Sequence, residues 1–328
     1  MSLVNEAGPE ALTEKRAARA RGEVPEGVTV DLGGLASVQR IHAVAIAVVP
    51  ALGTALAIWL AVVQGVSALD LGLLVFFYVF TMFGIGVGFH RLFSHRSFKA
   101  APSVRVAFAI AGSMAAQGPL IYWVANHRRH HQFSDRPGDT HSPYFNETGQ
   151  LGFWRGLWHA HMGWTFEPKM TNVLFFAKDL YRDPLIQRMN ALYYVWLVLG
   201  LAIPALIGGL WTMSLMGALT GFLWGGLVRM FLVYHVVNGV DSIVHMFGTQ
   251  PFECDDESRN NVPFVVASLG EGWHHNHHVF PTSAELNFDW WQLDPSQWLI
   301  RGLAALGLVW DIQRPTPGMI EAKRRRSA

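Results

Sequence analysis

The stretch IHAVAIAVVPALGTALAIWLAVVQGVSALDLGLLVFFYVFTMFGIGVGF, residues 41–89, decides the fold of this chain. Asp70 is its only Asp, Glu, Lys or Arg. A helix needs about 20 consecutive apolar residues to cross the hydrocarbon core of a bilayer. The stretch holds two such lengths, 43–64 and 70–89, with a very short turn between them at 66–69. It therefore predicts a hairpin of two membrane-spanning helices.

A second stretch has the same character. It carries no charged side chain between positions 189 and 228, and it divides into spans at 191–211 and 214–234 around Gly208-Gly209 and residues 211–214. The alternative is a large soluble core with two buried helical hairpins, but soluble helices of this length normally show a polar stripe. Only 15% of the chain is charged, against about 25% in a typical soluble protein. Four membrane spans are therefore expected.

The rest of the chain is interpreted around these hairpins. The stretch 101–125 is apolar but interrupted by Gly112, Gly118 and Pro119, so we expect an interfacial or re-entrant helix and not a fifth span. The expected organisation is listed in chain order: an N-terminal arm at 1–40, the first hairpin at 41–89, a segment with two histidine clusters at 90–188, the second hairpin at 189–234, and a C-terminal segment with a third cluster at 235–328.

The positive charges predict the orientation. Neither hairpin turn contains Lys or Arg, whereas most of these residues lie in the N-terminal arm, in 91–188 and in the tail at 323–326; those of the arm include Lys15, Arg16, Arg19 and Arg21. By the positive-inside rule both termini and the segment 90–188 face the cytoplasm. No apolar core follows within the first thirty residues, so no cleaved signal peptide is expected.

Composition narrows the functional classes. The net charge of +1 argues against a nucleic-acid surface, because no excess of Lys and Arg is present to neutralise phosphates. The single cysteine, Cys254, excludes an intrachain disulfide framework and a cysteine-based zinc or iron–sulfur site. Any metal must therefore be held by histidine and carboxylate side chains.

Histidine is the unusual residue of this chain. Fourteen of its fifteen histidines lie between positions 90 and 278, and the main clusters are HRLFSH, HRRHH and HHNHH. The last two share the spacing i, i+3, i+4, which places three imidazoles on one helical face. Imidazoles this close repel one another when protonated, and a metal binds and stabilises their neutral form. The sequence therefore predicts a metal site on the cytoplasmic side.

The number of candidate ligands suggests two metal ions. Adding the single histidine that follows the fourth span gives nine candidates: His90, His95, His127, His130, His131, His245, His274, His277 and His278. An all-nitrogen set suits Zn, Cu, Fe or Ni, but zinc usually takes four ligands. Nine are too many for one ion and suit two ions with five or six ligands each, and two iron ions beside apolar spans suggest oxygen activation on a lipid chain.

The remaining histidines are assigned other roles. A lone histidine at a membrane boundary is more often interfacial than a ligand, so His42, His141 and His235 are interpreted as structural. His159 and His161 are two positions apart and would point to different sides of a helix, so we expect them to support the ligands or to line an acyl site. His275 falls outside the i, i+3, i+4 face and is expected to be structural or supporting.

The clusters carry a family resemblance. GFHRLFSHRSFKA (88–100), NHRRHHQFSDRPGDTHSP (126–143) and SLGEGWHHNHHVFP (268–281) resemble the histidine boxes of the integral-membrane fatty acyl desaturases. Within that family they are most similar to the stearoyl type, which makes Δ9 double bonds and includes bacterial acyl-CoA and acyl-lipid enzymes. The resemblance runs from about position 88 to 281.

The resemblance implies a fold and a site. The fold would be an all-α integral membrane protein with four transmembrane helices and a cytosolic helical cap that holds a dinuclear metal site. The cofactor would be two non-haem iron ions on the nine histidines named above, with no catalytic residue beyond the metal centre. Asp241 stands where family members often have an asparagine that reaches the metal through water. The carboxylate would make the same water-mediated contact, bind the metal more directly, or alter its potential. Gln117 and Trp123 would line the substrate tunnel near its bend.

The resemblance also implies an activity. The enzyme would be an oxidoreductase that uses O₂ to insert a cis double bond at Δ9 into a saturated acyl chain of acyl-CoA or acyl-lipid, and a carrier-linked chain is also possible. Electrons would come from a ferredoxin, rubredoxin or cytochrome b5-type donor with an NAD(P)H reductase. The location would be the bacterial cell membrane, where the basic segments meet membrane lipid.

The sequence is also compatible with two other functions. A lipid or alkyl hydroxylase shares the general histidine pattern. A histidine-rich divalent-metal carrier belongs to another class, but a carrier needs polar residues inside its spans to pass an ion.

Overall fold

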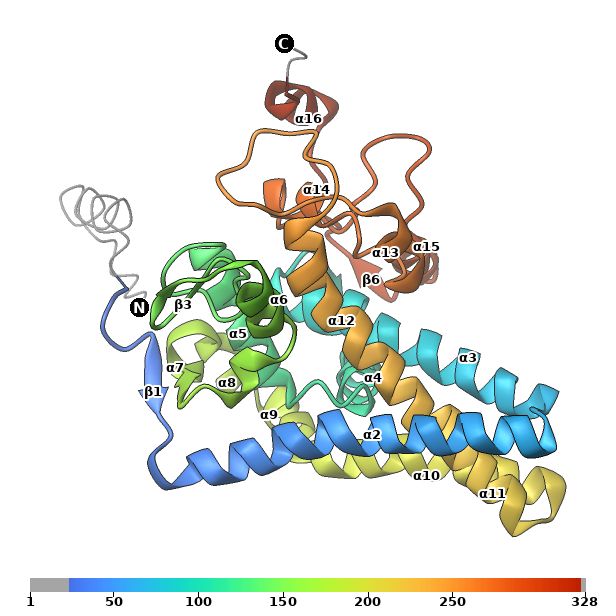
Figure 1. Cartoon of the computed structure of the whole chain (residues 1–328). Helices are drawn as coiled ribbons and strands as arrows, with labels where there is room; N and C mark the ends of the chain where they lie inside the picture. Colours follow the sequence, from blue (N-terminus) through green and yellow to red (C-terminus); the bar gives the residue numbers. More distant parts are fainter. Residues whose placement is uncertain (1–23, 326–328) are drawn as a thin grey trace.

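The computed structural model describes residues 24–325, and the predicted basic cluster at Lys15, Arg16, Arg19 and Arg21 lies outside them. The described chain is mainly helical (Figure 1). Its α-helices are α2 (Ala36–Gln64), α3 (Ala68–Phe83), α4 (Pro102–Met114), α5 (Leu120–Phe133), α6 (Phe153–His161), α7 (Val173–Phe176), α8 (Lys178–Tyr181), α9 (Pro184–Ala191), α10 (Tyr193–Thr212), α11 (Leu215–Gly221), α12 (Arg229–Met246), α13 (Val262–Ala267), α14 (His274–Val279), α15 (Pro295–Ala305) and α16 (Pro317–Lys323).

Short elements complete the chain. Two π-helical segments, η2 (Gly84–Ser94) and η4 (Phe222–Val228), continue α3 and precede α12, and 3₁₀ turns occur at η1 (Gly33–Leu35) and η3 (Gly163–Phe166). Among residues 24–325, six short strands form three antiparallel pairs: β1 (Thr29–Asp31) with β5 (Lys169–Thr171), β2 (Lys99–Ala100) with β6 (Val309–Trp310), and β3 (Phe145–Asn146) with β4 (Gly149–Gln150). These pairs fasten connecting segments and build no larger sheet.

In the described part of the chain, four helical stretches are long and apolar enough to cross a membrane: Ala36–Gln64, Ala68–Ser94, Tyr193–Thr212 and Leu215–Met246. Their outward faces carry exposed apolar side chains, for example Leu52 and Val62 on α2 and Leu206 and Leu210 on α10. An apolar face of this extent suits contact with lipid. The predicted all-helical fold with four spans is therefore confirmed.

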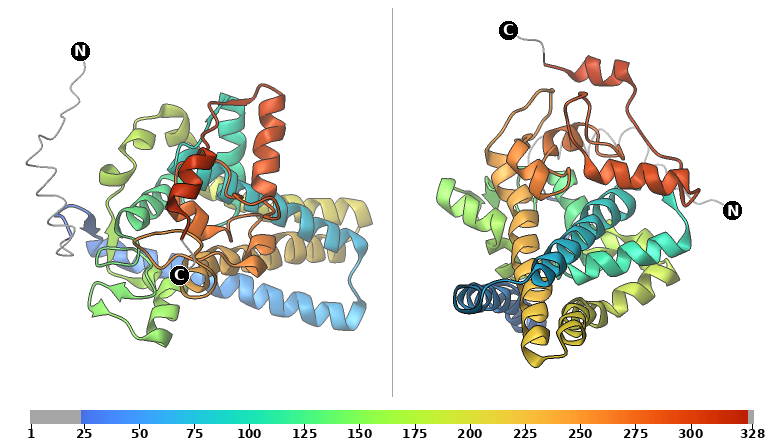
Figure 2. Two further views of the ribbon diagram at one scale, coloured as in Figure 1. Left: turned by 90° about the horizontal axis from the view of Figure 1, so that it is seen from above. Right: turned by 90° about the vertical axis from the view of Figure 1, so that its right-hand side faces the viewer.

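The two hairpins run side by side, and both of their turns lie at the same end of the molecule (Figures 1 and 2). In the first turn, the Ser67 hydroxyl accepts a hydrogen bond from the Asp70 backbone N–H at 3.1 Å, and the Asp70 carboxylate accepts one from the Ser67 N–H at 3.2 Å. This reciprocal cap satisfies two free N–H groups at the start of α3. It explains the single acidic residue of the stretch 41–89.

The stretch 101–125 forms two helices, α4 and α5, separated by a turn at 115–119. Gly118 in this turn has a φ of 92°, which favours glycine, and Pro119 precedes the first residue of α5. Gly112 does not interrupt the helix as expected. It lies inside α4, where a Cβ would collide with the Phe89 ring, so this glycine permits close packing of α4 on η2.

The elements that do not span form a cap on one side of the hairpins. Helices α5–α9 gather at the end opposite the hairpin turns, and α13–α16 lie beside the upper end of α12 (Figure 1). The main hydrophobic core joins the hairpins to this cap, because it includes Val87 and Phe89 of η2, Leu120 and Val124 of α5, and Ile186 of α9. The core thus fixes η2 and α5, which carry two of the histidine clusters.

Candidate metal centre

The first histidine cluster lies on a π-helix. His90 belongs to η2, and the His95 N–H donates to the His90 carbonyl at 3.1 Å. In a π-helix the hydrogen bond runs from i to i+5, so two residues five apart lie above one another. In a regular α-helix they would not share a face. The spacing HxxxxH therefore brings both imidazoles to one side because this segment is π-helical.

The other two clusters behave as their spacing predicts. His127, His130 and His131 lie on α5, and all of α14 is buried, including His274, His277 and His278. His245 is the last residue but one of α12. These helices meet η2 where the hairpins join the cap, so segments about 180 residues apart in sequence come together.

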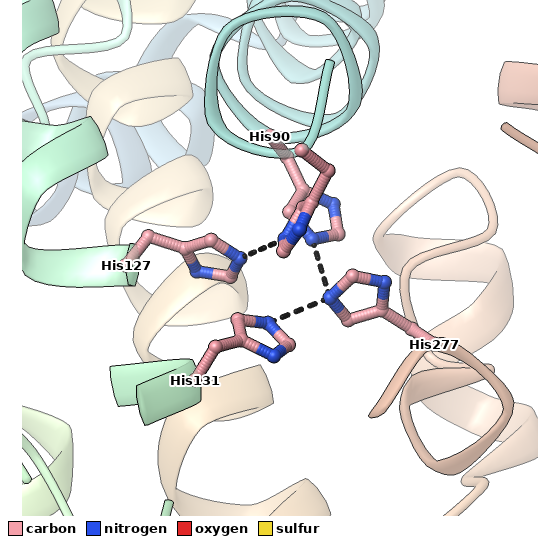
Figure 3. A group of neighbouring side chains, drawn as sticks. His90, His127, His131 and His277 are labelled. Atoms are coloured by element: carbon pink, nitrogen blue, oxygen red, sulfur yellow. Dashed lines mark hydrogen bonds between the residues drawn. The ribbon is translucent and has the colours of Figure 1, made fainter. Parts of the chain in front are cut away.

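Five histidines form the first nitrogen group: His90, His95, His127, His131 and His277, with one ring nitrogen of each lying within 4.8 Å of all the others. The Nε2 atoms of His90 and His277 are 2.9 Å apart, those of His277 and His131 are 2.8 Å apart, and those of His95 and His127 are 2.7 Å apart. Figure 3 shows the rings of His90, His127, His131 and His277 converging from η2, α5 and α14.

Four histidines form the second nitrogen group: His130, His245, His274 and His278. The Nε2 of His274 is 3.0 Å from that of His245 and 3.0 Å from that of His278, which in turn is 3.4 Å from the Nε2 of His130. Because α5 and α14 contribute side chains to both groups, the two groups are held side by side.

The geometry of both groups fits metal ions. Metal–nitrogen bonds of about 2.1 Å at right angles place neighbouring nitrogens roughly 3.0 Å apart, which matches these spacings. Hydrogen bonds alone cannot satisfy five converging nitrogens, since each N–H···N bond joins only two rings. A cation at the centre would be held by all five rings, each contributing one nitrogen lone pair.

The protonation state also suits a metal. Burial, together with repulsion from neighbouring imidazoles, lowers the pKa of His131, His274 and His277 well below the ordinary value. These rings are therefore neutral near pH 7, and the neutral imidazole is the form that binds a metal.

Four carboxylates hold the rings from behind. Each lies against the Nδ1 atom of one histidine: Asp135 with His245 at 2.8 Å, Asp139 with His130 at 3.0 Å, Asp256 with His278 at 2.7 Å and Glu271 with His90 at 2.5 Å. A carboxylate on Nδ1 fixes the tautomer and directs Nε2 toward the nitrogen group. Burial alone would lower the pKa of His130, but Asp139 outweighs it and raises the pKa to about 9.

Glu271 is in turn fixed by a buried arginine. The Arg91 guanidinium donates to the Glu271 carboxylate at 2.9 and 3.1 Å and to Asp294 at 2.8 and 3.0 Å. The Arg91 and Asp294 side chains are almost wholly buried. A buried arginine paired with two carboxylates is well compensated, and it joins the segment 271–294 rigidly to η2.

The other histidines lie outside the two nitrogen groups. The His275 Nδ1 donates to the Ser258 carbonyl at 2.9 Å, and its Nε2 accepts from the Phe252 N–H at 3.2 Å. His161 bonds His235 and Ser242, and His159 bonds the Ser142 carbonyl. His42 packs edge-on against Tyr193 and Tyr194.

His141 is more central than its structural interpretation suggested. Its ring stacks on His130 with centroids 4.5 Å apart, and its Nε2 lies 3.9 Å from the Asp241 carboxylate. One nitrogen of His141 lies within 4.8 Å of ligand atoms of His130 and Asp139. It therefore packs against the second nitrogen group from outside.

A small cavity lies beside the nitrogen groups, and a larger one lies next to the same parts of α5 and α12. The smaller is lined by Trp123, Val237 and Asp241 together with His90, His127 and His274. Trp123 stacks on the His127 ring with centroids 5.0 Å apart. The larger has a volume of about 710 Å³ and a mainly apolar lining that includes Gln117, Tyr122 and Asn238. Trp123 of α5 and Val237 of α12 line the smaller cavity, and their sequence neighbours Tyr122 and Asn238 line the larger one.

The four carboxylates were not anticipated from the sequence. Asp135 and Asp139 follow the second cluster directly in HQFSDRPGD, and Glu271 precedes the third in GEGWHH. Acidic residues flanking histidine clusters were a usable signal, because ligating histidines commonly donate to a carboxylate. Asp256 gave no such signal, since it lies in a loop 22 residues from its partner His278.

Comparisons with known proteins agree with this geometry. Residues 67–313 match the family model described as fatty acid desaturase. The chain is 45% identical over 298 residues to the hex-5-enoyl-[acyl-carrier protein] acetylenase of Moorena producens, covering 90% of this chain and 93% of that protein. It is 37% identical to the sn-1 stearoyl-lipid 9-desaturase of Synechocystis, covering 71% and 68%, and 35% identical to the delta-9 acyl-lipid desaturase 1 of Arabidopsis thaliana, covering 76% of each. The chain therefore belongs to the fatty acid desaturase family, and it is an oxidoreductase.

Proposed function

We propose that this protein is a membrane-bound di-iron desaturase that inserts a cis double bond, at Δ9, into a saturated fatty acyl chain. The observation that carries the proposal is the pair of all-histidine nitrogen groups, of five and four members, beside a small apolar cavity. The nine histidines of these groups are the proposed ligands.

Iron accounts for the ligand numbers better than zinc does. Zinc usually takes four ligands in a closed structural site and three in a catalytic one, whereas one group here offers five imidazoles. Imidazole also suits iron. The second group offers four imidazoles, and Asp241 lines the small cavity next to His274. This arrangement supports a water-mediated contact between Asp241 and the second iron ion.

The side chains divide the work of the reaction. When bound, the iron ions supply the O₂-dependent redox chemistry that removes hydrogen from unactivated carbons. The carboxylates behind His90, His130, His245 and His278 keep the rings oriented. Trp123 and Val237 line the space next to the ligands, and there they would hold one part of the acyl chain against the centre while excluding water.

The larger cavity supports the assignment of an acyl substrate. Gln117 and Tyr122 line it, and Trp123, the next residue after Tyr122, lines the smaller cavity beside the histidines. We propose that the two cavities are parts of one tunnel that bends near the metals. Relatives are named for chains attached to a carrier protein, to a lipid or to CoA. We propose acyl-CoA or acyl-lipid as the substrate of this chain, with acyl-carrier protein as the third form to be compared.

The topology and the electron donor complete the proposal. The cap lies opposite the hairpin turns, and those turns contain no Lys or Arg. By the positive-inside rule we propose that the cap and both termini face the cytoplasm of a bacterial cell. A polar cleft of about 590 Å³, lined in part by Arg136 and Lys323, reaches His131 and His278. This cleft is the proposed approach for a ferredoxin, rubredoxin or cytochrome b5-type donor that is supplied by an NAD(P)H reductase.

Product analysis tests the function. The protein is expressed in a bacterial host with a matching donor, defined saturated chains are fed, and fatty acid methyl esters are analysed by mass spectrometry. We expect a new cis-monoene with its double bond at Δ9. Hydroxy acids without alkenes would show a hydroxylase instead, and an alkyne would show an acetylenase. Purified protein given the same chain on CoA, on carrier protein and in a glycerolipid then identifies the acyl form.

A further inference from the structure

A buried arginine lies inside the fourth span. Arg229 is the first residue of α12 and its side chain is fully buried. It lies 15 residues beyond Ser214 in the hairpin turn, which is roughly 22 Å of helix, within the ~30 Å hydrocarbon thickness. An ionisable side chain at this depth is costly, and it marks a functional position by default.

Arg229 has no acidic partner among residues 24–325. Its guanidinium donates instead to three backbone carbonyls: those of Gly225 at 3.2 Å, Gly200 at 2.8 Å, and Met114. These carbonyls belong to η4, α10 and α4, so one side chain ties three segments together. The planar fork of arginine suits this task, because it presents five N–H donors in a fixed geometry.

The bond to Met114 has a particular consequence. Met114 is the last residue of α4, and the last four carbonyls of a helix lack partners within it. They also form the negative end of the helix dipole, which a cation stabilises. No basic residue occurs in the last turn of α4. Arg229 therefore supplies, from another helix, both the missing donor and the missing positive charge.

The turn that begins after Met114 forms part of the wall of the large cavity. Ala116, Gln117, Gly118 and Pro119 all line it. Ala116 has a φ of 62°, a conformation that L-residues rarely adopt and that persists only where the surroundings impose it. The same turn leads directly into α5 and its three ligand candidates. Its position thus sets the distance between the cavity wall and the metal centre.

We propose that Arg229 is a positioning residue that sets the site of double-bond insertion. By fixing the end of α4, it holds the cavity wall at 116–119 in register with the histidines of α5, and so determines which carbon of the acyl chain reaches the metals. This inference rests on the proposed desaturase function. It predicts that weakening the hydrogen bonds of Arg229 to the three carbonyls changes the position of the double bond, and not only the amount of product.

Three variants test the proposal in the full-length protein in membranes. Arg229→Met removes every donor, Arg229→Lys keeps the charge but loses the fork, and Gly200→Ala acts from α10, where its Cβ would lie 3.2 Å from the Arg229 Nη2 and 3.1 Å from the Met114 Cβ. Gly72→Ala is the matched control, because a Cβ there meets nothing within 4 Å. Double-bond positions are measured from dimethyl disulfide adducts, and bound iron is measured in the same samples.

The expected result is a change of regiochemistry. The single positional isomer of the wild type should become a mixture shifted by one or two carbons in Arg229→Lys and Gly200→Ala, with iron content and the Gly72→Ala product unchanged. If Arg229→Lys and Gly200→Ala make less product but keep the wild-type isomer pattern, the proposal is overturned. This holds even if Arg229→Met fails to accumulate, because the other two variants decide the question. If the wild type itself forms no alkene, the proposed function fails, a result distinct from an unaltered isomer pattern.

Discussion

Replacing His277 by alanine is expected to abolish the unsaturated product and to lower the bound iron. Its Nε2 lies within 3 Å of the Nε2 atoms of both His90 and His131, so its loss opens the first nitrogen group on the side where η2 and α5 meet α14. Ligand loss at a catalytic metal removes the chemistry itself and not merely its orientation. Product is measured as fatty acid methyl esters, and iron by elemental analysis of the purified protein.

His275→Ala is the matched control on the same helix. Its ring bonds the backbone of Ser258 and Phe252 and lies 3.3 Å from the Ser258 hydroxyl. Losing these bonds should lower the free energy of unfolding by about 1–3 kcal/mol while leaving iron and most of the activity in place. Complete loss of iron in His275→Ala, or wild-type activity in His277→Ala, would show that the histidines of α14 are assigned wrongly.

The second large effect is expected from a carboxylate that touches no metal. Asp256→Asn should lower activity or iron affinity by about 10–100-fold, the usual cost of removing a carboxylate behind a ligating histidine. Burial would raise the pKa of Asp256, but His278 lowers it well below its ordinary range, so the group is ionised. Asparagine retains an oxygen that can accept from the Ser258 N–H, which Asp256 accepts at 3.0 Å, so the loop is preserved while the charge is lost.

The neighbouring residue provides the control for this variant. The Asp255 side chain is 97% exposed, and within residues 24–325 its one ion pair is with Arg136 at 3.8 Å. Asp255→Asn should therefore leave iron affinity, measured by chelator competition, as in the wild type. Equal effects of the two substitutions would indicate a general electrostatic change of the surface and would contradict a specific role of Asp256 behind His278.

Much of this architecture was predictable from the sequence, because lipid imposes simple rules. The long apolar stretches could only be helices, and the two HxxHH clusters place three rings on one face of a regular helix. The π-helical form of 84–94 was not predictable, since it depends on the packing of η2 against α4. Gly112 was misinterpreted for the same reason. In the sequence, a glycine that makes room for the ring of a neighbouring helix cannot be distinguished from a glycine that ends its own helix.

The features that were missed depend on long-range contacts. Which histidines share a metal follows from how α5 and α14 cross, and spacing alone does not contain that information. Asp256 reaches His278 through a loop, and Arg91 joins segments 180 and 203 residues away. Arg229 was visible as a charge at the end of an apolar stretch, but its three carbonyl partners come from three separate segments.

The metal content of the purified wild-type protein tests the central claim most directly. Elemental analysis of protein purified from iron-supplemented cells should find about two iron ions per chain, one for each nitrogen group, with little zinc. About one zinc ion per chain and no iron would contradict the di-iron site and favour a metal-binding protein without redox chemistry.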